Sequence, residues 1–306
     1  MSTIIVGVDG SDRSVDALSF AAQLARSARG SLMLASAYPY DDHVAHPDTE
    51  LRHRLREGAQ RSLDAMRHQV PFGIPVTTRT IADRSPARAL HTLAVREHAS
   101  LVVLGSSHRG TVGRVVVGTT AERLLHGAPC PVAVVPRGAP LGNLETVVAG
   151  WDTRPESEAA LNAAAAIARA CGAQLRVVQV LDAPWLSQPA RATWPGLVAD
   201  PHTHERQARE RLDEVVAGLP DTVEAEALIL HDDPAGALAA QSEDADLLVL
   251  GSRGYGPHRS VLLGSVSARA VRASACPVIV VPRGVSAPLE ALFRQTLLAR
   301  AMPYAD

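Results

Sequence analysis

The chain has 306 residues, enough for two ordinary domains, and 46% of them are hydrophobic, so it can fill sizeable buried cores. Its formal net charge is only −2, which gives no electrostatic footprint for DNA or RNA. No apolar run approaches the roughly 20 residues that a membrane helix needs. We therefore expect neither a nucleic-acid partner nor a membrane partner.

The chain contains no lysine. A Walker A loop and a protein kinase both need a lysine to reach nucleotide phosphates, so the composition excludes both classes. The three cysteines form no Cys-x-x-Cys pair, and the first residues lack the basic segment of a signal peptide. We expect a cytoplasmic protein with reduced cysteines, of which Cys130 and Cys276 are buried at strand entries rather than reactive.

Strands and helices alternate along the first half of the chain. Apolar, β-rich runs predict strands at 3–9, 32–37, 76–81, 101–104 and 132–135. Helical spacing predicts helices between them at 14–29, 50–69, 86–98 and 119–125. Unbroken apolar strands that alternate with helices indicate a parallel sheet covered on both faces.

The same order of elements recurs from 147 to 281. An ungapped alignment of 99–138 with 245–284 gives 18 identical residues in 40, so the chain is a tandem repeat. We expect one domain at 1–138, a second at 144–284, and a C-terminal tail at 285–306. The tail has an amphipathic helical face, formed by Leu289, Leu292, Phe293, Leu297 and Leu298, that could dock on the body or on a partner.

The loop after the fourth strand of the second copy carries the clearest chemistry. That strand ends at Gly251, and Gly264 and Ser265 open the next helix. Gly251 and Gly254 permit positive φ and close approach to a ligand. Free N–H groups and the helix dipole at Gly264 favour an anion, and the Ser265 and Ser267 hydroxyls can donate to phosphate oxygens.

The end of the first strand should face the same crevice. In an open parallel sheet, ligands bind beyond the carboxyl ends of the strands at the point where chain order reverses. Strands one and four flank that point, so Asp152 should lie opposite Gly251.

The spacing Gly-x2-Gly-x9-Gly-Ser, the aspartate that ends strand one and the Cys-Pro-Val fifth strand together resemble the universal stress protein family. The resemblance covers nearly the whole chain, taken as two copies. It implies a Rossmann-like α/β fold of two doubly wound, five-stranded parallel sheets, each in the order 3-2-1-4-5. Many members of the family bind ATP at this loop, and they are implicated in stress tolerance, dormancy and regulation, mostly without an established reaction.

Carried over residue by residue, the resemblance implies an ATP site, with Mg²⁺ as a candidate companion ion. In the second copy the site would comprise Gly150, Asp152, Val180, Leu250, Gly251, Arg253, Gly254, Gly264, Ser265, Val266 and Ser267. In the first copy the counterparts are Gly7, Asp9, Gly105, Gly118 and Thr119. His108 stands where the second glycine of the motif should be, which puts nucleotide binding by the first copy in doubt. No residue is assigned a catalytic role or a direct bond to a metal.

Two other polar patterns have simpler explanations. Asp232 and Asp233 precede a helix that opens at Pro234, and capping accounts for them better than a catalytic carboxylate pair. The paired histidines, His43 with His46 and His202 with His204, lie in polar segments and are expected to be solvated.

The fifth strands are apolar and lie at a sheet edge, which is a liability unless another strand covers it. Their pairing resembles dimer formation in the family, so we expect a homodimer or a pseudo-dimer within one chain.

Three functions remain open. The first is an ATP-binding regulator of the stress response or dormancy that acts on an unidentified protein partner. The second is a slow ATPase or phosphotransferase, although the site offers Asp152 without a lysine or an obvious base. The third is an interaction scaffold with a vestigial nucleotide site, which His108 and the amphipathic tail favour.

Overall fold

The computed structural model describes residues 2–41, 48–106, 115, 117–139, 142–181, 201–252, 264–283 and 289–293. Within these ranges the predicted alternation of strands and helices is confirmed in both copies. The first copy contains β1 (Thr3–Gly7), α1 (Asp12–Ala28), β2 (Ser31–Tyr38), α2 (Thr49–Arg67), β3 (Val76–Ala82), α3 (Pro86–Arg96), β4 (Leu101–Gly105), α4 (Thr119–Leu125) and β5 (Val132–Val135). The second contains β6 (Thr146–Gly150), α5 (Pro155–Cys171), β7 (Gln174–Val180), α7 (Pro201–Ala217), β8 (Ala225–Leu230), α8 (Pro234–Gln241), β9 (Leu247–Gly251), α9 (Ser265–Ala273) and β10 (Val278–Val281).

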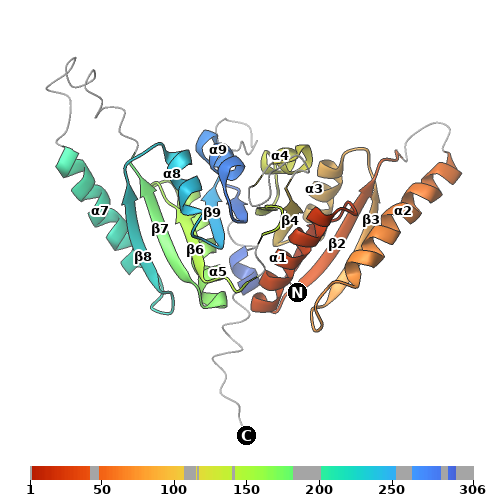
Figure 1. The fold of residues 1–306 in the computed structure, drawn as a ribbon, viewed down its shortest axis with the longest axis horizontal. Helices are drawn as coiled ribbons and strands as arrows, with labels where there is room; N and C mark the ends of the chain where they lie inside the picture. The colour runs from red at the N-terminus through yellow and green to blue at the C-terminus, as the bar shows by residue number, and fades with distance from the viewer. Residues whose placement is uncertain are drawn as a thin grey trace, which may run out of the picture.

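The two copies share one continuous ten-stranded sheet (Figure 1). Its order is β3-β2-β1-β4-β5-β10-β9-β6-β7-β8, so each copy has the order 3-2-1-4-5 and the fifth strands meet in the middle. All pairs within a copy are parallel, whereas β5 and β10 are antiparallel, with Ile279 opposite Ala133. The chain thus covers the apolar edge of each copy with the corresponding edge of the other.

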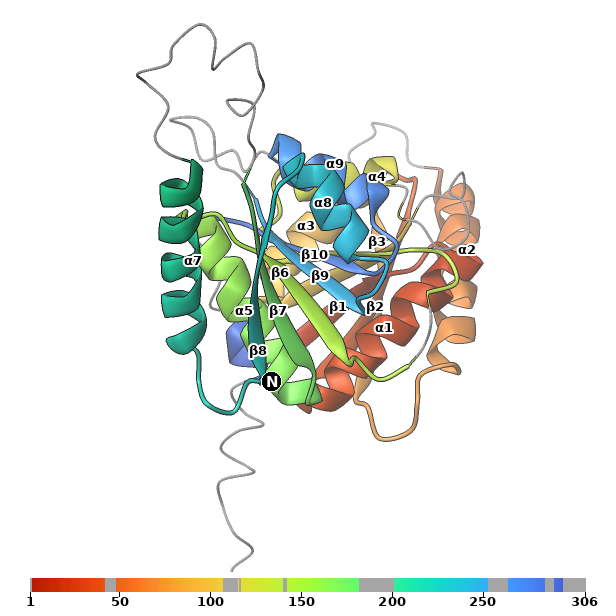
Figure 2. The same cartoon turned by 60° about the vertical axis from the view of Figure 1, so that its left-hand side comes forward.

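Helices cover both faces of the sheet (Figure 2). One core cluster joins the sheet to α1, α2, α5 and α7, and it runs through both copies. The other lies on the opposite face and contains residues of α3, α4, α8 and α9. Successive side chains of a strand point to opposite faces, so the unbroken apolar strands contribute to both clusters.

Local signals fix where several helices begin. The side chain of Asp48 accepts a hydrogen bond from the Leu51 N–H at the start of α2, and Ser85 accepts one from Arg88 at the start of α3. Asp233 caps α8 in the same way through Gly236, which confirms the capping interpretation of that aspartate.

The described part of the C-terminal tail, residues 289–293, is helical and docks on the body of the protein. Leu289, Leu292 and Phe293 are fully buried in the cluster that contains α1 and α5. Leu292 lies against Gly30, at the end of α1, so the tail of the second copy packs on the first. The tail residues Leu297 and Leu298 lie outside the described ranges.

The three cysteines are free thiols. Cys130 and Cys276 are buried, as predicted, and burial raises the pKa of each thiol to about 12. Neither thiol is ionised near neutral pH, and both act as small packing groups.

Shared strand pairing and a shared core predict that the two copies unfold together. Replacing fully buried Ile279 with alanine should lower the free energy of unfolding by about 2–5 kcal/mol, because a cavity opens at the β5–β10 junction. Urea unfolding followed by far-UV circular dichroism should show one transition, and its midpoint should shift to a lower urea concentration in the variant. Val95→Ala, at a side chain that is 51% exposed, should change the curve little. Two separate transitions, of which only one moves, would contradict this prediction.

Candidate functional site

The second copy has a pocket at the carboxyl ends of β6 and β9, which are neighbours in the sheet. After β6 the chain enters α5 on one face, and after β9 it enters α9 on the other, so a crevice opens between them. The pocket has a volume of about 450 Å³. Its lining combines apolar side chains, such as Val180, Leu238 and Leu250, with serine, aspartate and arginine.

Most of the residues predicted for this copy come together here. The pocket is lined by Gly150, Asp152, Val180, Leu250, Gly251, Ser265, Val266 and Ser267. Gly264 is the N-cap of α9, directly beside them. Arg253 and Gly254 lie outside the described residues.

The N-terminus of α9 is suited to an anion. Gly264 has extended backbone (φ −61°, ψ 152°), and no side-chain hydrogen bond caps the helix among the described residues. Ser265, the first helical residue, is exposed and lines the pocket. Helix N–H groups that no side chain satisfies, together with the helix dipole, favour negative charge at this point.

The Ser267 hydroxyl donates a hydrogen bond to the carbonyl oxygen of Gly251 at 2.8 Å. This bond joins α9 to the end of β9, and the expectation that the same hydroxyl donates to a phosphate stays a prediction. Ala121, its counterpart in the first copy, cannot make this bond.

Gly251 is required for a reason that the sequence did not show. The positive φ that glycine permits is not used here. Instead, a Cβ at this position would lie less than 3.0 Å from the backbone of Glu156, in the first turn of α5. Gly105 in the first copy meets the backbone of Arg13 in the same way. These glycines let a strand end touch a helix backbone and so form the floor of each crevice.

Asp152 presents its carboxylate to the pocket with few protein contacts. Oδ1 accepts the Arg154 N–H at 3.3 Å, and Oδ2 pairs with the Arg154 guanidinium at 3.2 Å. The backbone N–H of Asp152 donates to Ser157, which fixes the turn into α5. The position of this aspartate in the crevice agrees with the sequence prediction.

Sequence reasoning missed an ion pair in the lining of this pocket. Arg269 Nη2 lies 2.6 Å from Asp233 Oδ1, and both side chains line the pocket. The hydrogen bond from the Gly236 N–H and, to a smaller extent, the one from Arg269 hold the pKa of Asp233 below its ordinary value. The only signal in the sequence was the position of Arg269, one helical turn after Ser265.

The first copy has an equivalent pocket of about 620 Å³. The five residues predicted for this copy all line it: Gly7, Asp9, Gly105, Gly118 and Thr119. Gly118 is the N-cap of α4, again with no side-chain cap from the part of the chain that the structure describes. His108 lies outside the described residues, so its effect on the loop stays a prediction.

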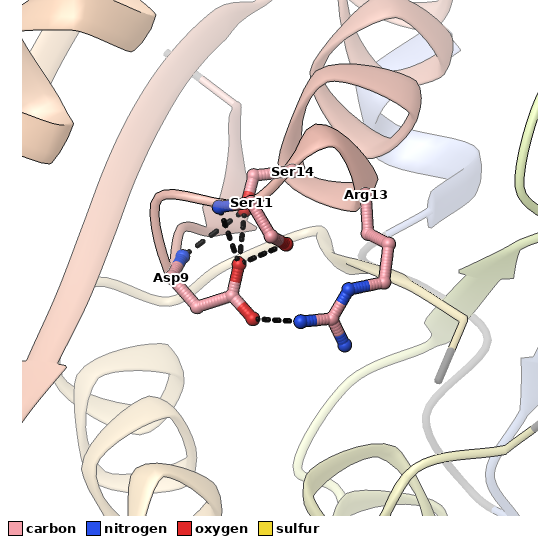
Figure 3. A network of polar contacts seen from close by, with 4 residues as sticks. All are labelled: Asp9, Ser11, Arg13 and Ser14. Carbon is pink, nitrogen blue, oxygen red and sulfur yellow. Dashed lines mark hydrogen bonds and ion pairs between the residues drawn. The ribbon is translucent and has the colours of Figure 1, made fainter. Parts of the chain in front are cut away.

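Asp9 is held far more tightly than Asp152 (Figure 3). Its carboxylate accepts hydrogen bonds from the Ser11 N–H, the Ser11 and Ser14 hydroxyls and Arg13. Burial by itself would raise the pKa of Asp9, but these hydrogen bonds and the charge of Arg13 outweigh it and lower the pKa. This carboxylate is therefore ionised at neutral pH and is largely satisfied by its own turn.

Two substitutions distinguish the turns of the two copies: Arg154 stands at the position of Ser11, and Glu156 at that of Arg13. Arg13 and Glu156 occupy equivalent positions in the first turns of α1 and α5. Arg13 turns back to Asp9 at 2.8 Å, whereas Glu156 pairs with Arg283 at 3.2 Å. The charge of Glu156 is thus balanced by Arg283, and the Asp152 carboxylate contacts Arg154 among the described residues.

Two absences in the described ranges bear on other functions. These ranges contain no group of three His, Cys, Asp or Glu side chains arranged to hold a metal ion. No helix in the same ranges is both long enough and apolar enough to cross a bilayer. His43 and His46 fall outside those ranges.

The fold and the pockets define a class: a tandem α/β protein with an anion-compatible crevice at the switch point of each copy. Comparison with known proteins gives the family. The model of the universal stress protein family matches residues 1–136 and again 143–282. The chain belongs to the universal stress protein family.

Relatives share the tandem architecture over nearly their full length. A universal stress protein of Mycolicibacterium smegmatis is 31% identical over 299 residues, covering 91% of this chain and 96% of the relative. One from Mycobacterium tuberculosis is 29% identical over 297 residues, covering 92% and 99%. Among solved structures, a universal stress protein of Archaeoglobus fulgidus has a TM-score of 0.70 at 18% identity, covering 92% of this chain and 98% of that one. This likeness supports the fold.

Gly251→Ala tests the close contact at the floor of the crevice. We expect a loss of about 1–3 kcal/mol in the free energy of unfolding, because the added methyl group would overlap the Glu156 backbone. Gly127→Ala is a matched control, since a Cβ there has no neighbour within 4 Å. Thermal unfolding of both variants provides the measurement. Equal stability of the two variants would show that the contact is not required.

Thr153 adopts a left-handed conformation with φ 64°, which a β-branched residue rarely tolerates. The equivalent residue of the first copy is Gly10, with φ 80°. Thr153→Gly should raise the free energy of unfolding by about 1 kcal/mol by removing this strain. Gly10→Thr should lower it by more, because its Cβ would also meet Ser62. Chemical denaturation measures both changes, and destabilisation by Thr153→Gly would contradict the assignment of strain.

Proposed function

We propose that this protein is a cytoplasmic ATP-binding regulator of the universal stress type, and that its second copy holds the principal nucleotide site. The observation that carries the proposal is the uncapped N-terminus of α9 beside Asp152 in a pocket of about 450 Å³. Pockets for small molecules commonly have volumes of 300–1,000 Å³, so the size suits a nucleotide.

The two walls of the pocket fit the two ends of ATP. Val180, Leu238 and Leu250 form an apolar wall near the ends of β6 and β7, which is suited to the adenine ring. Ser265 and the first turn of α9 form the polar wall, which is suited to phosphates. Asp152 lies between them and can accept a hydrogen bond from a ribose hydroxyl.

Magnesium would enter with the nucleotide. Mg²⁺ keeps several waters and is usually bound by substrate phosphates and one or two carboxylates. Asp152 is the exposed carboxylate best placed to contribute, and no all-protein cage is needed. Bound ATP would then bias the conformation or assembly that a protein partner recognises, since a ligand stabilises the state to which it binds more tightly.

The first copy supports a weaker proposal of the same kind. Its pocket and its uncapped α4 match those of the second copy. However, the Asp9 carboxylate is already occupied by Ser11, Arg13 and Ser14. We therefore expect the second copy to bind ATP more tightly than the first.

Ser265→Asp tests the proposal without disturbing the fold. A carboxylate at this exposed position favours the helix N-terminus but repels a phosphate. Equilibrium dialysis with labelled ATP should show an affinity loss of at least about tenfold, while the melting temperature is unchanged or higher.

Thr119→Asp places the same charge at the equivalent position of the first copy and serves as the control. It should leave the tighter site intact, and native mass spectrometry would count the nucleotides bound to each variant. If the wild-type protein binds no ATP, the proposed function is rejected. If Ser265→Asp binds ATP normally, the site lies elsewhere.

A further inference from the structure

The Arg269–Asp233 ion pair lines the second pocket and connects one helix to another. Arg269 lies on α9, one turn beyond Ser265 and on the same side of the helix. Asp233 is the N-cap of α8. The pair therefore joins the N-terminus of α8 to the middle of α9, and both residues line the pocket.

Arg269 can exchange its carboxylate partner for a phosphate. The two side chains are 56% and 48% exposed, and ion pairs with that exposure are held weakly. Asp233 offers Arg269 only Oδ1, because Oδ2 accepts the Gly236 N–H that caps α8. A phosphate can accept two parallel hydrogen bonds from the same guanidinium, which makes it the stronger partner.

Asp233 would stay in place after releasing Arg269. Its cap to Gly236 does not involve the arginine, so α8 keeps its N-terminus in either arrangement. The released carboxylate would then face the pocket without a countercharge, which limits the gain from the exchange.

The described residues of the first copy contain no such pair. The residue that caps α3 is Ser85, without a carboxylate. Arg123, the counterpart of Arg269, is exposed and is not among the residues that line the first pocket. The exchangeable arginine is thus specific to the second copy.

We propose that Arg269 reads the phosphate groups of the nucleotide in the second copy, and that Asp233 holds this arginine when no phosphate is present. The inference rests on the proposed function and adds a specificity-determining residue to it. Arg269 discriminates between a nucleotide and a nucleoside. Asp233 lowers the affinity for the phosphate by competing for the guanidinium.

The test measures the affinities of adenosine, AMP, ADP and ATP for the full chain by competition with a fluorescent ATP analogue. Arg269→Gln should weaken ATP binding about tenfold, equivalent to about 1.4 kcal/mol, and leave adenosine binding unchanged. The member of the series at which the loss first appears identifies the phosphate that Arg269 contacts. Arg269→Lys should restore part of the loss, because it keeps the charge but not the paired hydrogen bonds.

Asp233→Asn is the second variant, and asparagine is as good an N-cap as aspartate. It frees Arg269 and removes a negative charge, so ATP affinity should rise about threefold or more. Arg123→Gln is the matched control, and it should change neither the ATP affinity nor the adenosine affinity of the tighter site.

The outcomes separate this inference from the proposed function. Equal losses for adenosine and ATP in Arg269→Gln, or no loss for either, overturn the inference while ATP binding stands. Weaker ATP binding by Asp233→Asn also overturns it. Absence of ATP binding by the wild-type protein overturns the proposed function itself.

Discussion

The crevice depends on direct backbone contact between the end of β9 and the first turn of α5. Gly251 has no room for a Cβ because the Glu156 backbone fills that space, and Gly105 meets Arg13 in the same way. The contact fixes how the strand end, the turn that carries the aspartate and the following helix are arranged. Because it involves only backbone and Cβ atoms, the rest of the Arg13 and Glu156 side chains can differ while the scaffold is preserved.

That freedom explains why one scaffold yields two electrostatic environments. In the first copy Arg13 and two serines satisfy Asp9, and they lower its pKa against the opposing effect of burial. In the second copy Glu156 is held by Arg283, and among the described residues the Asp152 carboxylate contacts only Arg154. A carboxylate with unused acceptor capacity is better able to bind a ligand hydroxyl or a hydrated ion than one that its own turn has saturated.

Much of this arrangement could be read from the sequence, and what could not has a physical reason. Apolar periodicity located the strands and helices, and the repeat placed Asp152 and Gly251 at one crevice because parallel strands end together. The contact of Gly251 with α5 could not be read from the sequence, since it depends on how a helix packs on the sheet and not on local spacing. Asp233 and Arg269 are 36 residues apart, and their pairing requires that α8 and α9 lie side by side. The bond from the Ser267 hydroxyl to the Gly251 carbonyl oxygen could not be read from the sequence either, because the two residues are 16 positions apart and meet only in the folded chain.

The pairing of β5 with β10 has a further consequence for the two sites. It brings α9 of the second copy beside α4 of the first, where Arg272 lies 2.8 Å from Glu122. The Val115 N–H, just before α4, also donates to the carbonyl oxygen of Ser274 after α9. The ion pair is one-sided, because the counterparts of Glu122 and Arg272 are Ala268 and His126, which cannot form the same carboxylate–guanidinium pair. The two site helices are therefore in physical contact through groups that differ between the copies, and duplication followed by divergence accounts for both the shared sheet and the unequal pockets.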